Sequence, residues 1–175
     1  MKTEILPPLT DTPLRFSTAE AVEPRSSGIR MKNVLVPLDF TPHSLKSLEY
    51  AVNFAAQFGA KLTLVHVLEL QVYTPDLLGA IPLEPEQQAA AEREMEEIRA
   101  ARIPQTVPVR IDIRMNFALD GILDAAREFA ADLIITTTHG YTGLKHLCLG
   151  STAENIVRRA PCPVLVVREA EQDFV

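Results

Sequence analysis

Three glycines fall within one short segment near the C-terminal end of the chain, and two hydroxyl side chains close it. Gly140 and Gly143 open this segment, and Gly150, Ser151 and Thr152 close it where a helix is expected to begin. A glycine backbone can approach oxygen atoms closely, and the amides at a helix N-terminus favour an anion. The segment therefore suits a phosphate group, with the two hydroxyls as further donors. Taken alone, Gly150-Ser151-Thr152 equally suits a tight turn followed by an N-cap.

Other polar side chains follow the expected ends of two strands. Pro37 and Asp39 come at the exit of the first strand, and Thr137 and His139 at the exit of the fourth. The Asp39 carboxylate can accept hydrogen bonds from a base or a ribose, or it can cap the turn that follows. His139 can contact phosphate or hold the loop through a backbone hydrogen bond. His66 interrupts an apolar strand and predicts a histidine bonded to backbone.

The elements that position these residues alternate between strands and helices. Thr41 and Pro42 predict the start of the first helix, and Gly59 predicts its end. Apolar runs predict buried strands at 34–38, 62–67, 133–138 and 164–167, and alternation predicts an edge strand with one wetter face at 109–116. Further helices are expected at 84–101, 119–130 and 151–160. The pattern predicts an α/β fold with a doubly wound, five-stranded parallel sheet of order 3-2-1-4-5. In that order, the first and fourth strands flank the ligand crevice.

The composition limits the possible partners. The chain has 175 residues, of which 47% are hydrophobic and 23% charged, enough for one core. Its net charge of -6 disfavours nucleic acid and anionic membranes. No apolar run approaches the roughly 20 residues of a membrane-spanning helix. Cys148 and Cys162 form no metal-ligand spacing with histidines, so the sequence predicts a reduced, cytoplasmic protein without a metal site.

Several short motifs after Arg30 carry a family likeness. They read VLVPLD at 34–39, VHV at 65–67, THG at 138–140, GSTAENIV at 150–157 and APCPVLVV at 160–167. Together they resemble the universal stress protein family, whose fold is of the adenine nucleotide alpha hydrolase-like type. The nucleotide-binding branch of that family has a G-x2-G-x9-G-S/T pattern. Nine residues separate Gly140 from Gly150 here, but Thr137 replaces the first glycine.

The resemblance implies a ligand and a role for the candidate residues. The ligand would be ATP, ADP or AMP, with Mg²⁺ carried by the phosphates. Asp39 and Val67 would flank the adenine, and Pro37 would shape the exit of the first strand. The full set of candidate residues is Pro37, Asp39, Val67, Thr137, His139, Gly140, Gly143, Gly150, Ser151 and Thr152.

Three functions are consistent with this pattern. The leading hypothesis is an adenine-nucleotide-binding regulatory module of the stress response. An ATP-hydrolysing enzyme is less well supported, because the sequence has no P-loop lysine, no SGG-type loop and no evident activating base. Slow hydrolysis stays open, since it needs only a positioned water. The third hypothesis is a nucleotide-free, dimeric interaction protein of the same family, which Thr137 favours.

Two regions are expected to lie outside the nucleotide site. Residues 1–30 contain four prolines and no sustained periodicity, which predicts a flexible N-terminal extension before a domain at 31–175. The last strand, 164–167, is continuously apolar and lies at a sheet edge in the expected order. It therefore predicts a homodimer paired through this strand.

Overall fold

The computed structural model describes residues 30–69, 85–138 and 150–168. Over these residues the strands and helices alternate, and every strand pair in the sheet is parallel. The strand order is β3-β2-β1-β4-β5, which confirms the predicted α/β fold and sheet order. The strands are β1 (Asn33–Pro37), β2 (Lys61–Glu69), β3 (Val109–Asn116), β4 (Leu133–Thr137) and β5 (Val164–Val167). The helices are α1 (Pro42–Phe58), α2 (Pro85–Arg102), α3 (Ala118–Glu128) and α4 (Ser151–Arg159).

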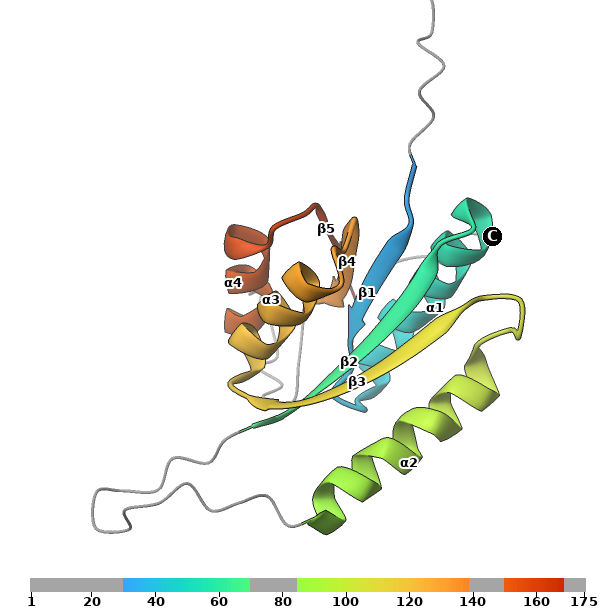
Figure 1. Ribbon diagram of the computed structural model, residues 1–175. Coiled ribbons are helices and arrows are strands. Elements are labelled where there is room, and N and C mark those ends of the chain that lie inside the picture. The colour runs from blue at the N-terminus through green and yellow to red at the C-terminus, as the bar shows by residue number, and fades with distance from the viewer. Residues whose placement is uncertain (1–29, 70–84, 139–149, 169–175) are drawn as a thin grey trace, which may run out of the picture.

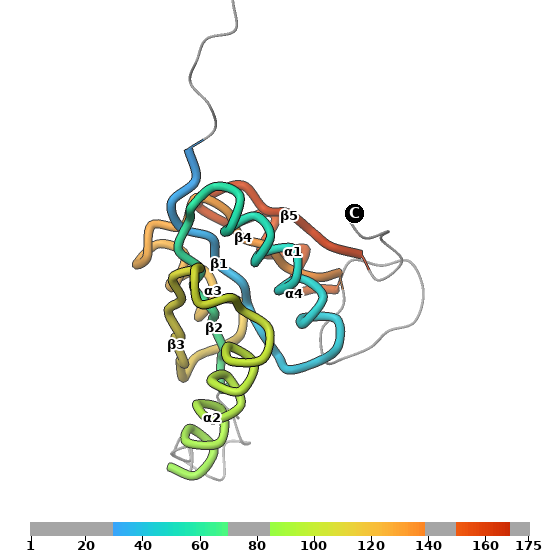
Figure 2. Tube along the Cα trace, turned by 90° about the vertical axis from the view of Figure 1, so that its right-hand side faces the viewer, coloured from blue at the N-terminus to red at the C-terminus, as the bar shows by residue number. Residues whose placement is uncertain are grey.

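Two helices cover each face of the sheet (Figures 1 and 2). Helices α1 and α2 pack over one core cluster, which includes Val34 and Leu64. Helices α3 and α4 pack over the other, which includes Leu35 and Val65. Neighbouring residues of one strand thus enter opposite cores, because side chains alternate along a strand. This burial on both faces explains why the central strands are continuous apolar runs.

Helix α1 begins and ends where the sequence predicts. Thr41 is the N-cap, and its hydroxyl accepts a hydrogen bond from the Ser44 amide at 3.3 Å, with Pro42 as the first helical residue. Gly59 ends the helix in the left-handed conformation, at φ 63°, and its N–H donates to the Ala55 carbonyl. The N-cap fixes the turn that joins β1 to α1, and therefore the position of Asp39.

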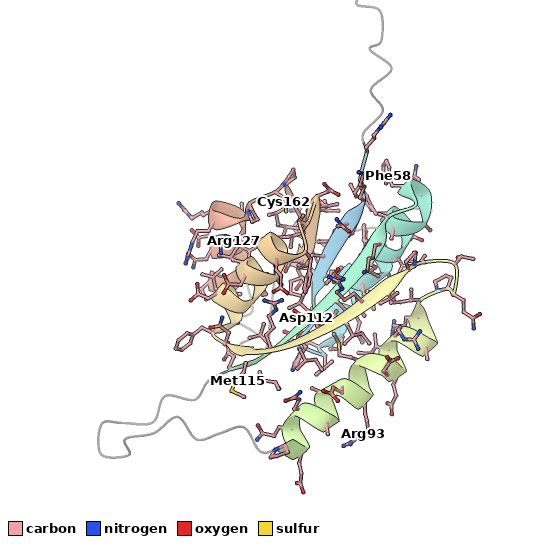
Figure 3. The ribbon with its side chains drawn as sticks, viewed as in Figure 1. Phe58, Arg93, Asp112, Met115, Arg127 and Cys162 are labelled. Atoms are coloured by element: carbon pink, nitrogen blue, oxygen red, sulfur yellow. The ribbon has the colours of Figure 1, made fainter. Side chains whose placement is uncertain are left out.

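The polar face of the edge strand β3 is more covered than predicted. Arg114 forms ion pairs with Asp112 of the same strand and with Glu128 of α3, the latter at 2.7 Å (Figure 3 labels Asp112). The guanidinium carbons of Arg110 and Arg114 lie 4.4 and 5.2 Å from the centre of the Phe129 ring. The prediction of a wet face was therefore wrong for Asp112 and Arg114, because the end of α3 packs over them.

The apolar face of β3 is shorter than predicted. Ile111 and Ile113 pack against the core under α2, whereas Met115 is 51% exposed at the end of the strand (Figure 3). Helix α2 buries few residues, among them Met95, and Arg93 points away from the sheet (Figure 3). Within the described ranges, none of the helices has both the length and the apolar character that crossing a membrane requires.

One carboxylate ties the first and fourth strands together at their amino ends. The amides of Lys32 and Asn33 both donate to Oδ2 of Asp132, at 2.7 and 2.9 Å. The Asp132 amide donates in return to the Asn33 carbonyl at 2.9 Å. These bonds hold β1 against β4 at the edge of the sheet opposite to the candidate site.

Candidate functional site

The first and fourth strands separate toward their carboxyl ends. They pair at two positions, Val34 with Leu133 and Leu35 with Ile134. Beyond these positions β1 stays paired only with β2, and β4 only with β5. A crevice therefore opens at the carboxyl edge, where the strand order reverses. Open parallel sheets bind their ligands at this point.

The candidate residues Asp39 and Thr137 lie on opposite sides of this crevice. Pro37 is the last residue of β1 and is half-buried, as is Thr137 at the end of β4. Asp39 and Thr138 each follow the paired residues Leu35 and Ile134 by four positions, so they lie at a similar height along the sheet. The predicted juxtaposition of the two strand ends is confirmed by the strand order.

The side chain of Asp39 organises the turn that enters α1. Its Oδ1 accepts hydrogen bonds from the Thr41 amide at 3.1 Å and from the Thr41 hydroxyl at 2.6 Å. The Ser44 hydroxyl accepts a bond from the Asp39 amide at 3.3 Å. Of the two roles that the sequence left open for Asp39, turn capping is the one these contacts show. A ligand contact for the same carboxylate stays a proposal.

Phe40, in the turn after β1, is a feature that the sequence did not reveal. It takes the left-handed conformation, with φ at 63°. Its ring stacks on His66, with the ring centroids 4.2 Å apart and an interplanar angle of 25°. His66 Nδ1 lies 2.8 Å from the Leu38 carbonyl, and it must be the donor because a carbonyl can only accept. The prediction that His66 is bonded to backbone is therefore confirmed.

Val67 lies on β2, with its side chain packed under α3. It contacts the core cluster on that face, and an added Cβ at Gly121 of α3 would come within 2.9 Å of its Cγ2 atom. The close approach of helix and strand therefore fixes the Val67 side chain. Its position near the carboxyl end of β2 places its backbone at the same edge of the sheet as Asp39.

Gly150 joins the end of β4 to the start of α4. Its amide donates to the Thr138 carbonyl at 2.8 Å, so residues 138 and 150 are in direct contact. A Cβ at Gly150 would stand 3.0 Å from that same carbonyl oxygen. The φ of Gly150 is -56°, which any residue can adopt. A side chain here would need the Thr138 carbonyl to shift by a few tenths of an ångström, whether or not a ligand is bound.

Among the described residues, no side chain caps the N-terminus of α4. Gly150 is the N-cap, and no side chain accepts a hydrogen bond from the first-turn amides among the described residues. Ser151 and Thr152 are exposed on this first turn. The predicted alternative of a tight turn followed by an N-cap is compatible with these contacts, with Gly150 itself as the N-cap. Amides that lack a side-chain cap at a helix N-terminus can donate to water or to an anion.

A small pocket lies beside this junction, on the face of the sheet that α1 covers. Its volume is about 170 Å³. It is lined by Pro42, His43, Lys46, Thr137, Thr138, Val167 and Arg168. Its basic residues were not predicted from the sequence, because nothing in their spacing indicates that the first turns of α1 face the end of β5.

Part of the predicted site lies outside the described residues. His139, Gly140 and Gly143 belong to the segment 139–149, as do Lys145, His146 and Cys148. Over the described ranges 30–69, 85–138 and 150–168, His, Cys, Asp and Glu side chains form no group of three or more that could hold a metal ion. Any magnesium at this site would therefore need ligands from phosphate or from outside these ranges.

Comparison with known proteins identifies the family. Residues 31–168 match the model of the universal stress protein family. The chain belongs to the universal stress protein family. Universal stress protein MJ0531 of Methanocaldococcus jannaschii is 29% identical, over 81% of this chain and 85% of the relative. A universal stress protein of Thermus aquaticus is 34% identical, over 78% of this chain and 98% of the relative. The solved structure of universal stress protein UspA from Lactobacillus plantarum matches with a TM-score of 0.67 and 27% identity, over 81% of this chain and all of that one.

Two more distant universal stress protein structures share the fold and hold nucleotides. One is a complex with cAMP, with a TM-score of 0.57 and 24% identity, over 80% of this chain and 98% of that one. The other, from Archaeoglobus fulgidus, is a complex with dAMP, with a TM-score of 0.57 and 18% identity, over 79% of this chain and 98% of that one. Both ligands are adenine nucleotides with a single phosphate.

Proposed function

We propose that this universal stress protein binds an adenine nucleotide in the crevice between β1 and β4, and acts as a regulatory module of the stress response. The observation that carries the proposal is the separation of these strands at the switch point. Asp39 lies on one side of the crevice, and the N-terminus of α4, which no described side chain caps, lies on the other. ATP is the proposed ligand, with Mg²⁺ carried by its phosphates.

The proposed orientation of the nucleotide follows from the chemistry of the two sides. Phosphates fit the N-terminus of α4, where the amides, the partial positive charge and the Ser151 and Thr152 hydroxyls all favour an anion. The base fits the side of Asp39 and Val67, which offers a carboxylate and strand backbone. Gly140, Gly143 and His139 would complete the phosphate side.

Two alternatives follow from particular residues. Thr137 stands where the nucleotide-binding branch of the family has glycine, which supports a nucleotide-free interaction protein. Slow hydrolysis of bound ATP needs only a positioned water and stays compatible with the proposal. Release of ADP over hours would support an enzyme, and a protein purified without nucleotide would support the interaction protein.

The proposal includes a homodimer in the cytoplasm. Strand β5 lies at the edge of the sheet and has no partner strand on its outer side within the described chain. An apolar edge strand of this kind favours pairing with a second copy. The absence of a metal-ligand or disulfide-like spacing around Cys148 and Cys162 supports a reducing compartment.

The experiment is calorimetric titration of the full chain with ATP, ADP and AMP in the presence of magnesium. Wild type should bind with micromolar affinity, because no lysine of a P-loop contacts the phosphates. The variant Ser151→Asp places a carboxylate on the first turn of α4, which should stabilise the helix by about 0.3–1 kcal/mol and repel phosphate. ATP affinity should fall at least tenfold while the melting temperature holds or rises.

Gln87→Asp supplies a matched control. It makes the same charge change in the first turn of α2, where Gln87 is exposed on the opposite face of the sheet. Its ATP affinity should equal that of wild type. A wild-type protein that gives no heat with any of the three nucleotides, or a Ser151→Asp variant that binds as well as wild type, would contradict the proposed site.

A further inference from the structure

The pocket beside the junction of β4 and α4 gathers basic groups from two separate elements. His43 and Lys46 come from the first turns of α1, and Arg168 follows the end of β5. Thr137, the last residue of β4, and Thr138, which follows it, also line the pocket. Of the described residues that line the pocket, none carries a carboxylate. Over the described residues, the lining therefore combines three basic side chains with two threonines and the apolar Pro42 and Val167.

The position of these groups on α1 strengthens their preference for an anion. The N-terminal end of a helix bears a partial positive charge, which acidic residues in the first turn normally offset. Helix α1 has no acidic residue in its first turn, although the Asp39 carboxylate lies two residues before its N-cap; His43 is in the first turn and Lys46 in the second. The next carboxylate along the helix, Glu49, pairs with Arg102 of α2 at 3.0 Å.

The pocket adjoins the proposed phosphate position. Thr138 lines the pocket, and its carbonyl accepts the hydrogen bond from the Gly150 amide at 2.8 Å. The N-cap of α4 is therefore hydrogen-bonded directly to a residue that lines the pocket. In a nucleotide with more than one phosphate, the chain of phosphates can continue from α4 toward the pocket.

We infer that this pocket receives the terminal phosphates of a nucleoside di- or triphosphate, through Lys46, Arg168 and His43. The inference rests on the proposed function. It adds that the chain distinguishes nucleotides by the number of their phosphates. AMP reaches the amides of α4 alone, whereas ADP and ATP also reach the basic pocket and gain charge-assisted hydrogen bonds there.

The test compares the affinities of AMP, ADP, ATP and free pyrophosphate by calorimetry, at fixed magnesium and ionic strength. Wild type should bind ATP more tightly than AMP. Lys46→Gln and Arg168→Gln should each lower ATP affinity about tenfold, which is typical of one charged hydrogen bond, while AMP affinity changes less than twofold. Arg168 is exposed, so its variant should fold even where Lys46→Gln loses stability.

Lys32→Gln is the matched control, since Lys32 is exposed just before β1, at the opposite edge of the sheet. It removes the same charge and should leave all four affinities unchanged. Equal binding of AMP and ATP by wild type, or unchanged ATP affinity in both pocket variants, would overturn the inference while the proposed function stands. Wild type that binds pyrophosphate but no nucleotide would overturn both, and would leave an anion pocket for free pyrophosphate.

Discussion

Replacement of Gly121 by alanine tests how tightly α3 fixes Val67. The new Cβ would lie 2.9 and 3.1 Å from the two Cγ atoms of Val67, and 3.4 Å from Cβ of Asn116. Carbon atoms in contact normally lie about 3.5–4.0 Å apart, so two of these distances are several tenths of an ångström too short. Val67 is stiff at χ1, so its methyl groups cannot easily turn away.

The expected magnitude comes from two opposing effects. Alanine in a helix interior is more favourable than glycine by about 0.5–1 kcal/mol, because it restricts the unfolded chain. Overpacking of a tight contact costs about 1–3 kcal/mol. The cost of overpacking should exceed the gain from alanine. Gly121→Ala should therefore lower the free energy of unfolding by about 1–2 kcal/mol, as measured by urea denaturation.

A double-mutant cycle separates this contact from other effects. Val67→Ala removes both Cγ atoms and leaves space for the new methyl group at position 121. In this background Gly121→Ala should be neutral or stabilising, with a coupling energy of about 1–2 kcal/mol. The reasoning is refuted if Gly121→Ala stabilises the wild-type chain, or if the two substitutions are simply additive.

Two further predictions concern the backbone of the turn after β1 and the sheet edge. Phe40→Ala should be less stable than Phe40→Gly by about 0.5–1 kcal/mol in urea denaturation. Both variants lose the stack on His66, but only glycine adopts φ 63° without strain. The reverse order of stability would show that the turn relaxes. Val166→Pro should give folded monomers in sedimentation. The carbonyls of Pro163 and Val167 accept hydrogen bonds from β4, so in a parallel ladder the N–H of Val166 between them points away from β4. Proline removes this outward donor without breaking a bond to β4. A dimer that survives this change would place the interface elsewhere.

The sequence was sufficient for the sheet order because each element has a strong local signal. The caps at Thr41, Pro42 and Gly59 and the apolar runs of the central strands are determined by neighbours in the chain. The crevice between β1 and β4 follows from that order. Its outline, with Asp39 opposite the end of β4, was therefore predictable without coordinates.

Other features depend on contacts between distant segments and have no local signal. The left-handed backbone of Phe40 accompanies its stack on His66, a residue of a different element. Arg114 is covered because the end of α3 packs over β3, which alternation within the strand cannot show. The basic pocket exists only because α1 lies across the ends of β4 and β5.

Gly150 lies at the start of α4, as predicted, but a substitution of this glycine is a poor test of phosphate binding. The Thr138 carbonyl stands 3.0 Å from where a side chain at Gly150 would begin, so a substitution there disturbs this junction with or without a ligand. A Gly150→Val variant would strain the junction of β4 and α4, and its loss of binding would say little about phosphate. Ser151 is exposed on the first turn, with no packing role among the described residues that a substitution would disturb. A carboxylate at Ser151 changes the charge that a phosphate meets while the helix gains a favourable first-turn residue. Loss of binding in a Ser151→Asp protein of normal stability can therefore be assigned to the ligand site.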